Sequence, residues 1–429
     1  MRRLYSLLIV LLLPLLLLRL YWRGFKAPFY RERWRERLGF LPHPGNPGGL
    51  WLHAVSVGEV QAVAPLIRQL LANSTRSLVI TTTTPTGAQR VRELFGDEVQ
   101  HYFAPFDAPF IVKRFFDRLQ PRLLILVETE IWPNLISMAD GLGVPILLAN
   151  ARLSVRSARR YHRFAGLTRE TLQKITLIAP HGEADAQRFC ALGARRSQVE
   201  VIGSIKFDIR LPASLRERSE VLRREWDTER PVWIAASTHE GEDEQVLAAH
   251  RTVMAALPES LLVLVPRHPE RFDQVAELIR AGGFRCVRRS ERRACGADVE
   301  VFLGDSMGEL TLFMGAADVA FIGGSLVPHG GHNMLEAAAQ GVPVLIGPYM
   351  FNFAEISELF LRQQAALQVN SSTELAQRLI RWLSDASERS QFGERGRELV
   401  DRNRGALARL YGLVKRLLNQ PSDKAEKPR

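Results

Sequence analysis

Cysteine is scarce in this sequence. Its three residues, Cys190, Cys286 and Cys295, are too few and too widely spaced for a disulfide framework or a cysteine-based zinc site. No motif for binding RNA or DNA is found, and no repeat of solenoid period is present. The 429 residues are 46% apolar and 24% charged, which is typical of a folded protein with two domains of ordinary size.

Long apolar runs are also absent, with one exception at the N-terminus. Residues 4–18 (LYSLLIVLLLPLLLL) fall at the short end for a membrane-spanning helix of about 20 residues. No small-x-small cleavage site follows, which argues against a signal peptide. Basic residues follow instead, and the positive-inside rule then keeps the rest of the chain in the cytoplasm. Arg2 and Arg3 weaken that asymmetry, so residues 1–22 are predicted to be an anchor that either crosses the bilayer or lies in its interface.

Residues 23–49 form a basic segment with regularly spaced aromatic residues. The first 40 residues carry nine Lys and Arg against two Glu, a net charge of +7, and this excess beside an apolar run indicates anionic lipid. Residues 24–38 have the composition of an interfacial amphipathic helix. A helix packed on the first domain is the alternative, and residues 43–49 (HPGNPGG) read as a linker.

Short apolar runs then alternate with helical segments, a pattern typical of parallel sheets covered on both faces. The expected strands are residues 50–55, 78–82, 123–127, 145–149, 176–179 and 199–202, then 232–235, 261–265, 284–287, 301–303, 317–322 and 343–346. Residues 375–383 and 389–418 are predicted to be closing helices. We therefore expect an α/β protein with Rossmann-like domains at residues 50–210 and 211–419, and a disordered tail at residues 420–429.

A glycine-rich stretch at residues 304–353 is the centre of the second domain. Glycines at 323, 324, 330 and 331 follow an expected strand and let the backbone turn tightly and approach a ligand. A helix is expected from His332 or Asn333, and its N-terminus would favour an anion such as phosphate. The glycine pattern is neither a P-loop nor the dinucleotide fingerprint, so an ordinary strand–helix crossover is the alternative.

Ligands of parallel sheets bind at the carboxyl ends of strands, and several expected strands of the first domain end in chargeable residues. Glu59 follows the first strand and is placed as a general base, or else as a first-turn acid that complements the helix dipole. Glu128 and Glu130 end a buried strand, which is costly for carboxylates without a partner or a use. Lys206 supplies a cation at the end of the domain, unless it only pairs with Asp208.

Strand ends of the second domain carry groups suited to a nucleotide. Arg267 is a fixed cation for a phosphate, and residues 304–310 offer a turn with free N–H groups. Glu336 lies where its carboxylate can accept from the diol of a ribose. His329 and His332 lack a third ligand at metal spacing, so we predict no metal and no cofactor.

The glycine-rich stretch resembles the donor-nucleotide segment of glycosyltransferases with the GT-B fold, in which two Rossmann-like domains face each other. Taken with the other motifs, the chain resembles the bacterial 3-deoxy-D-manno-octulosonic acid (Kdo) transferases of lipopolysaccharide assembly over nearly its whole length. The motifs that carry this resemblance are VSVGE, ETEIWPN, NARLS, GSIKFD, STHEGEDE, VPRHPER, GDSMGEL and GGHNMLEAAAQGVPVLIGP.

The resemblance implies an inverting transfer of Kdo from CMP-Kdo to the lipid A precursor lipid IVA, at the cytoplasmic face of the inner membrane. It implies Glu59 as the proton acceptor, and Glu128 and Lys206 as stabilisers of the transition state. The CMP contacts that it implies are Pro266, Arg267, Met307, Gly308, Glu309, Asn333, Met334, Leu335 and Glu336. A GT-B enzyme that uses a UDP-sugar and a membrane-tethered scaffold without activity are the alternatives. The number of Kdo units and the oligomeric state stay open.

Overall fold

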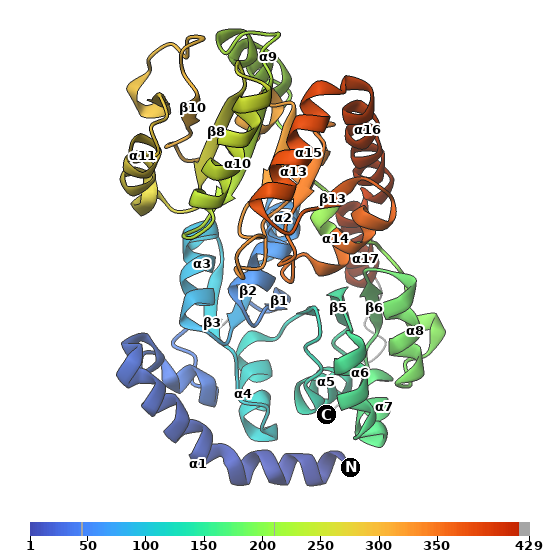
Figure 1. Cartoon of the computed structure of the whole chain (residues 1–429). Helices are drawn as coiled ribbons and strands as arrows, with labels where there is room; N and C mark the ends of the chain where they lie inside the picture. The colour runs from blue at the N-terminus through green and yellow to red at the C-terminus, as the bar shows by residue number, and fades with distance from the viewer. Residues whose placement is uncertain (44–45, 210, 420–429) are drawn as a thin grey trace. The chain divides into compact units, whose positions relative to one another are not determined.

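The computed structural model describes residues 1–43, 46–209 and 211–419 (Figure 1). The chain forms two compact units, of which the first joins Met1–Asp208 to the C-terminal residues from Arg404 onward and the second is Ile209–Asn403. Each unit is built on one parallel sheet with helices, so the predicted α/β class with two Rossmann-like domains is confirmed. The tail predicted at residues 420–429 lies outside the described residues.

The sheet of the first unit has the strand order β3-β2-β1-β4-β5-β6. This doubly wound order reverses direction between β1 and β4, the point where parallel sheets of this kind bind ligands. The strands are apolar and almost wholly buried, as expected for a sheet covered on both faces. Their bounds are β1 Leu50–His53, β2 Leu78–Thr82, β3 Gln100–Phe103, β4 Leu123–Val127, β5 Ile146–Ala151 and β6 Leu177–Pro180.

Helices of the first unit begin at local signals in the sequence. Ser56, Thr84 and Ser154 are N-caps whose hydroxyls accept backbone N–H groups, and proline occupies the first turn of α3, α4 and α5. The helices are α1 Arg2–Lys26, η1 Pro28–Tyr30, η2 Trp34–Leu38, α2 Val57–Asn73, α3 Pro85–Phe95, η3 Gly96–Glu98, α4 Pro109–Leu119, α5 Pro133–Gly141, α6 Val155–His162, α7 Ala165–Leu172, α8 Glu183–Ala191, η4 Arg196–Gln198, η5 Ile205–Phe207 and α17 Ala406–Asn419.

The sheet of the second unit has the order β13-β12-β11-β7-β8-β10-β9 and reverses between β7 and β11. Its strands are β7 Val232–Thr238, β8 Leu261–Pro266, β9 Cys286–Arg288, β10 Val301–Leu303, β11 Val319–Ile322, β12 Val344–Ile346 and β13 Ala366–Gln368. Its helices are α9 Leu215–Glu225, α10 Asp243–Ala256, η6 Pro269–Arg271, α11 Phe272–Ala281, η7 Arg289–Glu291, α12 Leu310–Ala316, α13 Leu335–Ala338, α14 Ala354–Arg362, α15 Ser372–Ser384 and α16 Ala386–Asn403.

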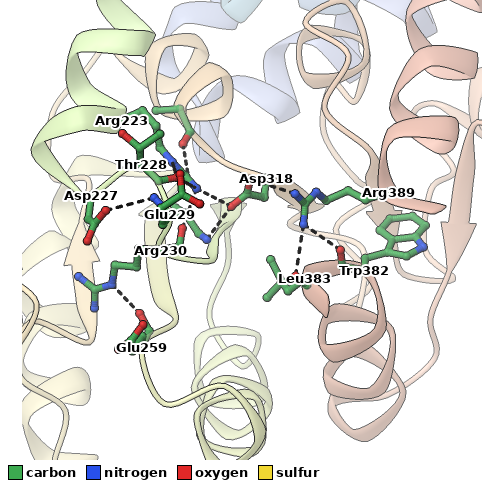
Figure 2. Close-up of polar contacts among 12 residues, drawn as sticks. Arg223, Asp227, Thr228, Glu229, Arg230, Glu259, Asp318, Trp382, Leu383 and Arg389 are labelled. Carbon is green, nitrogen blue, oxygen red and sulfur yellow. Dashed lines mark hydrogen bonds and ion pairs between the residues drawn. The ribbon is translucent and has the colours of Figure 1, made fainter. Parts of the chain in front are cut away.

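Asp318 ties three elements of the second unit together at the amino end of its sheet (Figure 2). One carboxylate oxygen accepts from the Arg223 guanidinium of α9 at 3.0 Å and from the Val232 N–H of β7 at 2.8 Å. The other oxygen lies 3.7 Å from the guanidinium of Arg389, on α16. A half-buried carboxylate with these partners is stabilising, because a charged hydrogen bond holds α9, and an ion pair holds α16, against the strands.

The last helix corrects the predicted domain boundaries. We expected residues 211–419 to form the second domain, but α17 packs into the hydrophobic core of the first unit, where Leu410 and Val414 lie with Val60 and Val63 of α2. Asp208 holds the start of this last segment, since its carboxylate accepts from the N–H groups of Gly405 and Leu407, both at 2.6 Å. The single helix predicted at residues 389–418 is thus two helices that belong to different units.

Other local predictions also differ from the structure. Residues 199–202 form no strand and contribute a single bridge between Val199 and Ile178. Strands β3 and β13 were not predicted. The amphipathic helix expected over residues 24–38 is replaced by the end of α1 and two short 3₁₀ helices, because Pro28 supplies no N–H and Arg33 adopts a left-handed conformation with φ of 51°.

Candidate active site

Glu59 lies at the switch point of the first sheet, in the first turn of α2 after β1. Its side chain is 9% exposed and accepts from the Val55 N–H at 2.7 Å and from the Ser56 hydroxyl at 3.0 Å. These contacts are those of an acid that caps a helix N-terminus. Glu59 therefore fills the role of first-turn acid, which the sequence left as the alternative to a general base. The pKa of Glu59 is raised to about 8, mainly by burial and also by the nearby carboxylates of Glu130 and Glu128, while the hydrogen bonds from Val55 and Ser56 oppose the rise.

Glu128 and Glu130 follow β4, the strand beside β1, so the structure brings them to Glu59. Glu128 has a φ of 61°, a left-handed conformation that costs a non-glycine residue on the order of 1–3 kcal/mol and is typical of functional sites. Glu130 accepts from the indole N–H of Trp132 at 2.6 Å, and burial raises its pKa. Its carboxylate also lies 4.0 Å from His53, whose pKa burial lowers to about 4.

Lys206 lies in η5, which packs against α2. The two elements share a core in which Ile205 lies with Val60, one residue after Glu59. The three residues predicted to be catalytic therefore come from elements of one unit that are packed together. The carboxylate of Asp208 caps the segment that leads into α17.

A pocket of about 530 Å³ opens beside Glu130 and Trp132 at the carboxyl ends of β2, β3 and β4. Its walls include Thr83, Asp107 and Tyr161 from these strand ends and from α6, and Tyr5, Arg19 and Arg23 from the N-terminal helix α1. Arg37 also lines it and donates to the Thr83 carbonyl at 2.8 Å. The pocket combines apolar walls with cations and is suited to a ligand that carries both lipid and phosphate.

The residues predicted to contact CMP end or follow three strands of the second sheet, β8, β10 and β11, and β7 lies between β11 and β8. Because these strands are parallel, their carboxyl ends share one edge. Pro266 ends β8, and the Arg267 N–H donates to the Thr238 carbonyl of β7 at 3.0 Å. Met307, Gly308 and Glu309 form the turn between β10 and α12, and Gly308 has a φ of 82°.

Glu309 lies in an electropositive surrounding. Its carboxylate accepts from Nη2 and Nε of Arg289, at 2.8 and 3.1 Å, and from the Ser306 hydroxyl at 2.6 Å. The hydrogen bonds from Arg289 hold its pKa below the usual range. Both residues line a pocket of about 880 Å³ whose walls also include Trp226 and Phe302. An aromatic floor with arginines at the rim is suited to a nucleotide.

The predicted helix after the glycine loop is shorter and begins later than expected. It comprises only Leu335–Ala338, so its dipole is small, and the expected anion site at its N-terminus is not supported. Asn333 stabilises the first turn of this helix, since its side chain accepts from the Leu335 N–H at 3.2 Å and donates to the Glu336 carboxylate at 2.9 Å. Burial raises the pKa of Glu336, and the bond from Asn333 opposes this.

Glu242 organises the glycine loop, a role that sequence reasoning missed. This buried carboxylate accepts from the N–H groups of Gly324, Ser325 and Leu326 at 2.6, 3.0 and 2.9 Å. A Cβ on Gly323 would lie 2.5 Å from the Ser237 carbonyl, so this glycine serves the close approach of the loop to β7. The signal in the sequence is the acidic cluster after β7, within the motif STHEGEDE.

Histidine side chains gather at the same switch point. His239, which follows β7, shares a 2.8 Å contact between Nε2 atoms with His332 and stacks on His329 with ring centroids 4.1 Å apart. No group of three or more His, Cys, Asp or Glu residues is arranged to hold a metal ion within residues 1–43, 46–209 and 211–419. Through these contacts His329 and His332 pack the glycine loop against the end of β7.

Known protein families match both units. Residues 32–209 match the family model described as 3-Deoxy-D-manno-octulosonic-acid transferase (kdotransferase), and residues 229–399 match that of Glycosyl transferases group 1. A 3-deoxy-D-manno-octulosonic acid transferase of Haemophilus influenzae is 43% identical over 97% of this chain and 98% of its own length. One from Bordetella pertussis is 37% identical over 84% of this chain and 85% of its own.

Solved structures also resemble the chain. A glycosyltransferase from Rickettsia africae covers 88% of this chain and 100% of its own, with 14% identity and a TM-score of 0.54, which shows a shared fold. The C-terminal CMP-Kdo binding domain of WaaA from Acinetobacter baumannii is 32% identical over 44% of this chain and 99% of its own, with a TM-score of 0.43.

Proposed function

The chain belongs to the family of Kdo transferases, which are glycosyltransferases, and we propose that it moves Kdo from CMP-Kdo to the lipid A precursor lipid IVA at the cytoplasmic face of the inner membrane. The observation that carries this proposal is the buried Glu59 at the switch point of a unit that matches the Kdo transferase model. The neighbouring pocket, with apolar walls and arginines, supports an acceptor that is both lipid and phosphorylated.

Glu59 acts as the general base. A hydroxyl of the acceptor is a poor nucleophile, and a carboxylate that takes its proton contributes roughly 10²–10⁴-fold to the rate. A pKa near 8 makes Glu59 a stronger base than an exposed glutamate, since its conjugate acid holds the proton more firmly. One displacement by the activated hydroxyl inverts the anomeric centre of Kdo.

The other groups stabilise charge as the bond to CMP breaks. The sugar develops oxocarbenium character, which the negative charge of Glu128 favours, and the leaving phosphate develops negative charge, which Lys206 and Arg267 favour. Residues 307–309 and 333–336 hold the nucleotide. These assignments need no metal, because fixed cations and backbone N–H groups neutralise the phosphate.

Mass spectrometry of lipid IVA incubated with CMP-Kdo and the purified protein tests the proposal. Wild type should add Kdo to lipid IVA. Glu59→Gln should lower the rate of transfer at least 10²-fold while the variant still binds CMP. Glu93→Gln, on the exposed face of α3, is the matched control and should keep the rate of wild type. Absence of product with wild type would overturn the donor and acceptor. Inhibition by UDP but not by CMP would favour the alternative of a GT-B enzyme that uses a UDP-sugar.

A further inference from the structure

The N-terminal helix α1 contacts the first unit close to its own beginning. The Tyr5 hydroxyl donates to the Asp107 carboxylate at 3.0 Å, and the Ser6 hydroxyl donates to the Asn134 side chain at 2.8 Å. These acceptors are well fixed, because Asp107 also accepts from the N–H groups of Asn134 and Leu135 at the start of α5. The first turns of the apolar helix are therefore held by polar groups of the globular unit.

The other end of α1 is held by the same unit. Arg31 covers the rings of Tyr21 and Phe25 at 4.4 and 4.0 Å. The chain that follows is pinned to the sheet, since the Phe103 N–H of β3 donates to the Glu36 carboxylate at 2.9 Å. Both Glu36 and Arg37 are buried. The start of α1 thus contacts the beginning of α5, and the segment that follows α1 is bonded to β3.

The face that α1 turns inward differs from the face that it turns outward. Half-buried positions recur at helical spacing, at Tyr5, Ser6, Ile9, Leu13, Leu16, Leu17 and Leu20. The opposite face carries apolar side chains that are more than half exposed, at Leu4, Leu7, Leu8, Leu11, Leu15, Leu18 and Trp22. Figure 1 shows α1 (dark blue) running along the outside of the first unit, below α4 and α5.

Length and composition do not decide how this helix meets a membrane. Residues Arg2–Phe25 have a mean hydropathy of 2.3 in their most apolar window and are long enough to cross. At 1.5 Å per residue such a helix measures about 36 Å, close to the hydrocarbon thickness of about 30 Å. In a crossing helix, however, Tyr5 and Ser6 would lie on the far side of the bilayer from Asp107 and Asn134, and both hydrogen bonds would be lost.

We propose that α1 lies in the plane of the membrane surface instead of crossing the bilayer, and that its inner face forms one wall of the pocket that receives the phosphorylated head of the lipid acceptor. The leucine face enters the boundary between headgroups and acyl chains, to a depth of about 5–10 Å. The second part of this proposal rests on the proposed function, and the first part does not.

Aromatic and basic side chains continue the membrane face beyond α1. Phe29, Trp34, Phe40 and Phe110 are between 44% and 63% exposed. Trp34 and Phe40 line a second pocket of the first unit together with five arginines, Arg31, Arg33, Arg35, Arg114 and Arg118. Exposed aromatic rings interleaved with arginines are typical of the headgroup layer of an anionic leaflet.

Two residues of α1 connect this face to the pocket beside Glu130. Arg19 and Arg23 line that pocket together with Arg37, and they belong to the same helix whose leucines face outward. A lipid can therefore keep its acyl chains in the bilayer while its phosphates meet these guanidinium groups. An arginine binds a phosphate through paired, charged hydrogen bonds.

Labelling with a membrane-impermeant maleimide tests the orientation. Arg3→Cys is compared with Glu98→Cys, an exposed position in η3, in a chain whose three native cysteines are replaced by serine. In intact spheroplasts and in inverted vesicles, both sites should react from the same side. Reaction of Arg3→Cys only from the side opposite to Glu98→Cys would overturn the in-plane orientation. If the cysteine-free chain does not fold, the same two variants in the native background are compared with wild type.

Kinetics test the pocket wall. Arg19→Gln and Arg23→Gln should raise the KM for lipid IVA at least 10-fold and leave the KM for CMP-Kdo unchanged, whereas Arg3→Gln, which does not line the pocket, should change neither. An unchanged KM for lipid IVA in both variants would overturn the second part. If wild type itself makes no product, the proposed function fails, and the labelling result still decides the orientation.

Discussion

The Nε2 atoms of His239 and His332 lie 2.8 Å apart, in rings whose planes differ by 4°. One nitrogen must donate and the other accept, so the pair holds a single proton between the two rings. The contact joins the end of β7 to the loop before α13, and a second proton would break it. A Cβ on Gly324 would lie 3.2 Å from both rings, so the glycine loop packs against this pair.

The histidine pair predicts a loss of stability in acid. The pKa of His332 is lowered to about 4, mainly by burial and also by His239 and the nearby Arg267. The folded state therefore resists protonation, and its stability, complete above the unfolded pKa of about 6.5, falls as the pH drops toward 4. Thermal unfolding between pH 7 and pH 4 should show a steeper fall for wild type than for His332→Gln. Parallel curves would contradict a neutral pair.

The carboxylates of Glu59, Glu128 and Glu130 lie close together, and this predicts how the transfer rate depends on pH. Glu59 must be ionised to accept a proton, and its pKa is about 8, so kcat/KM should rise with pH, reach half of its maximum near pH 8 and level off only above that pH. Glu130 is the stronger of the two carboxylate influences that raise this pKa. Glu130→Gln should therefore move the rise to lower pH, while Glu93→Gln should leave it in place. A rise that is centred near pH 4.5 in wild type would remove Glu59 from the role of base.

The left-handed backbone at Glu128 predicts that two truncations differ in stability. Glu128→Gly and Glu128→Ala remove the same carboxylate, but only glycine adopts a φ of 61° without cost. Glu128→Gly should be the more stable by about 1 kcal/mol in urea unfolding, and both should lose transfer activity. Equal stability of the two variants would show that the backbone relaxes at this position.

The contacts of Asp318 with Arg223, Val232 and Arg389 predict that substituting Asp318 lowers the stability of the fold and leaves the catalytic rate unchanged. Asp318→Ala leaves Arg223 and the Val232 N–H without this acceptor and should lower the free energy of unfolding by about 1–3 kcal/mol. Glu220→Ala breaks a pair with Arg216 that is largely exposed and should cost less than about 1 kcal/mol. Thermal unfolding and the activity of the folded fraction measure both effects. A large fall in kcat for Asp318→Ala would contradict a purely structural role.

Fully buried strands with an apolar run were readable from the sequence. Leu78–Thr82 and Leu123–Val127 match their predicted bounds, because a strand buried on both faces is mostly apolar; only Thr81 and Thr82 in these two strands are polar. The two missed strands lie at the ends of their sheets, where one neighbour is lacking. Gln100–Phe103 begins with half-buried Gln100 and His101, and Ala366–Gln368 is only three residues long. Such short or half-polar strands carry no run that the sequence alone reveals.

The sequence by itself determined which residues follow each strand, and so placed Glu59, Glu128 and Arg267 at the right edges of the right sheets. The tertiary structure alone decided which of these groups meet. His239 and His332 are 93 positions apart, and Glu242 reaches residues 82 to 84 positions away. It also decided that α17 returns to the first unit and that α1 is held at both ends. The physical reason is the same in each case: composition sets how apolar a segment is, while only the folded chain brings distant polar partners within hydrogen-bond reach.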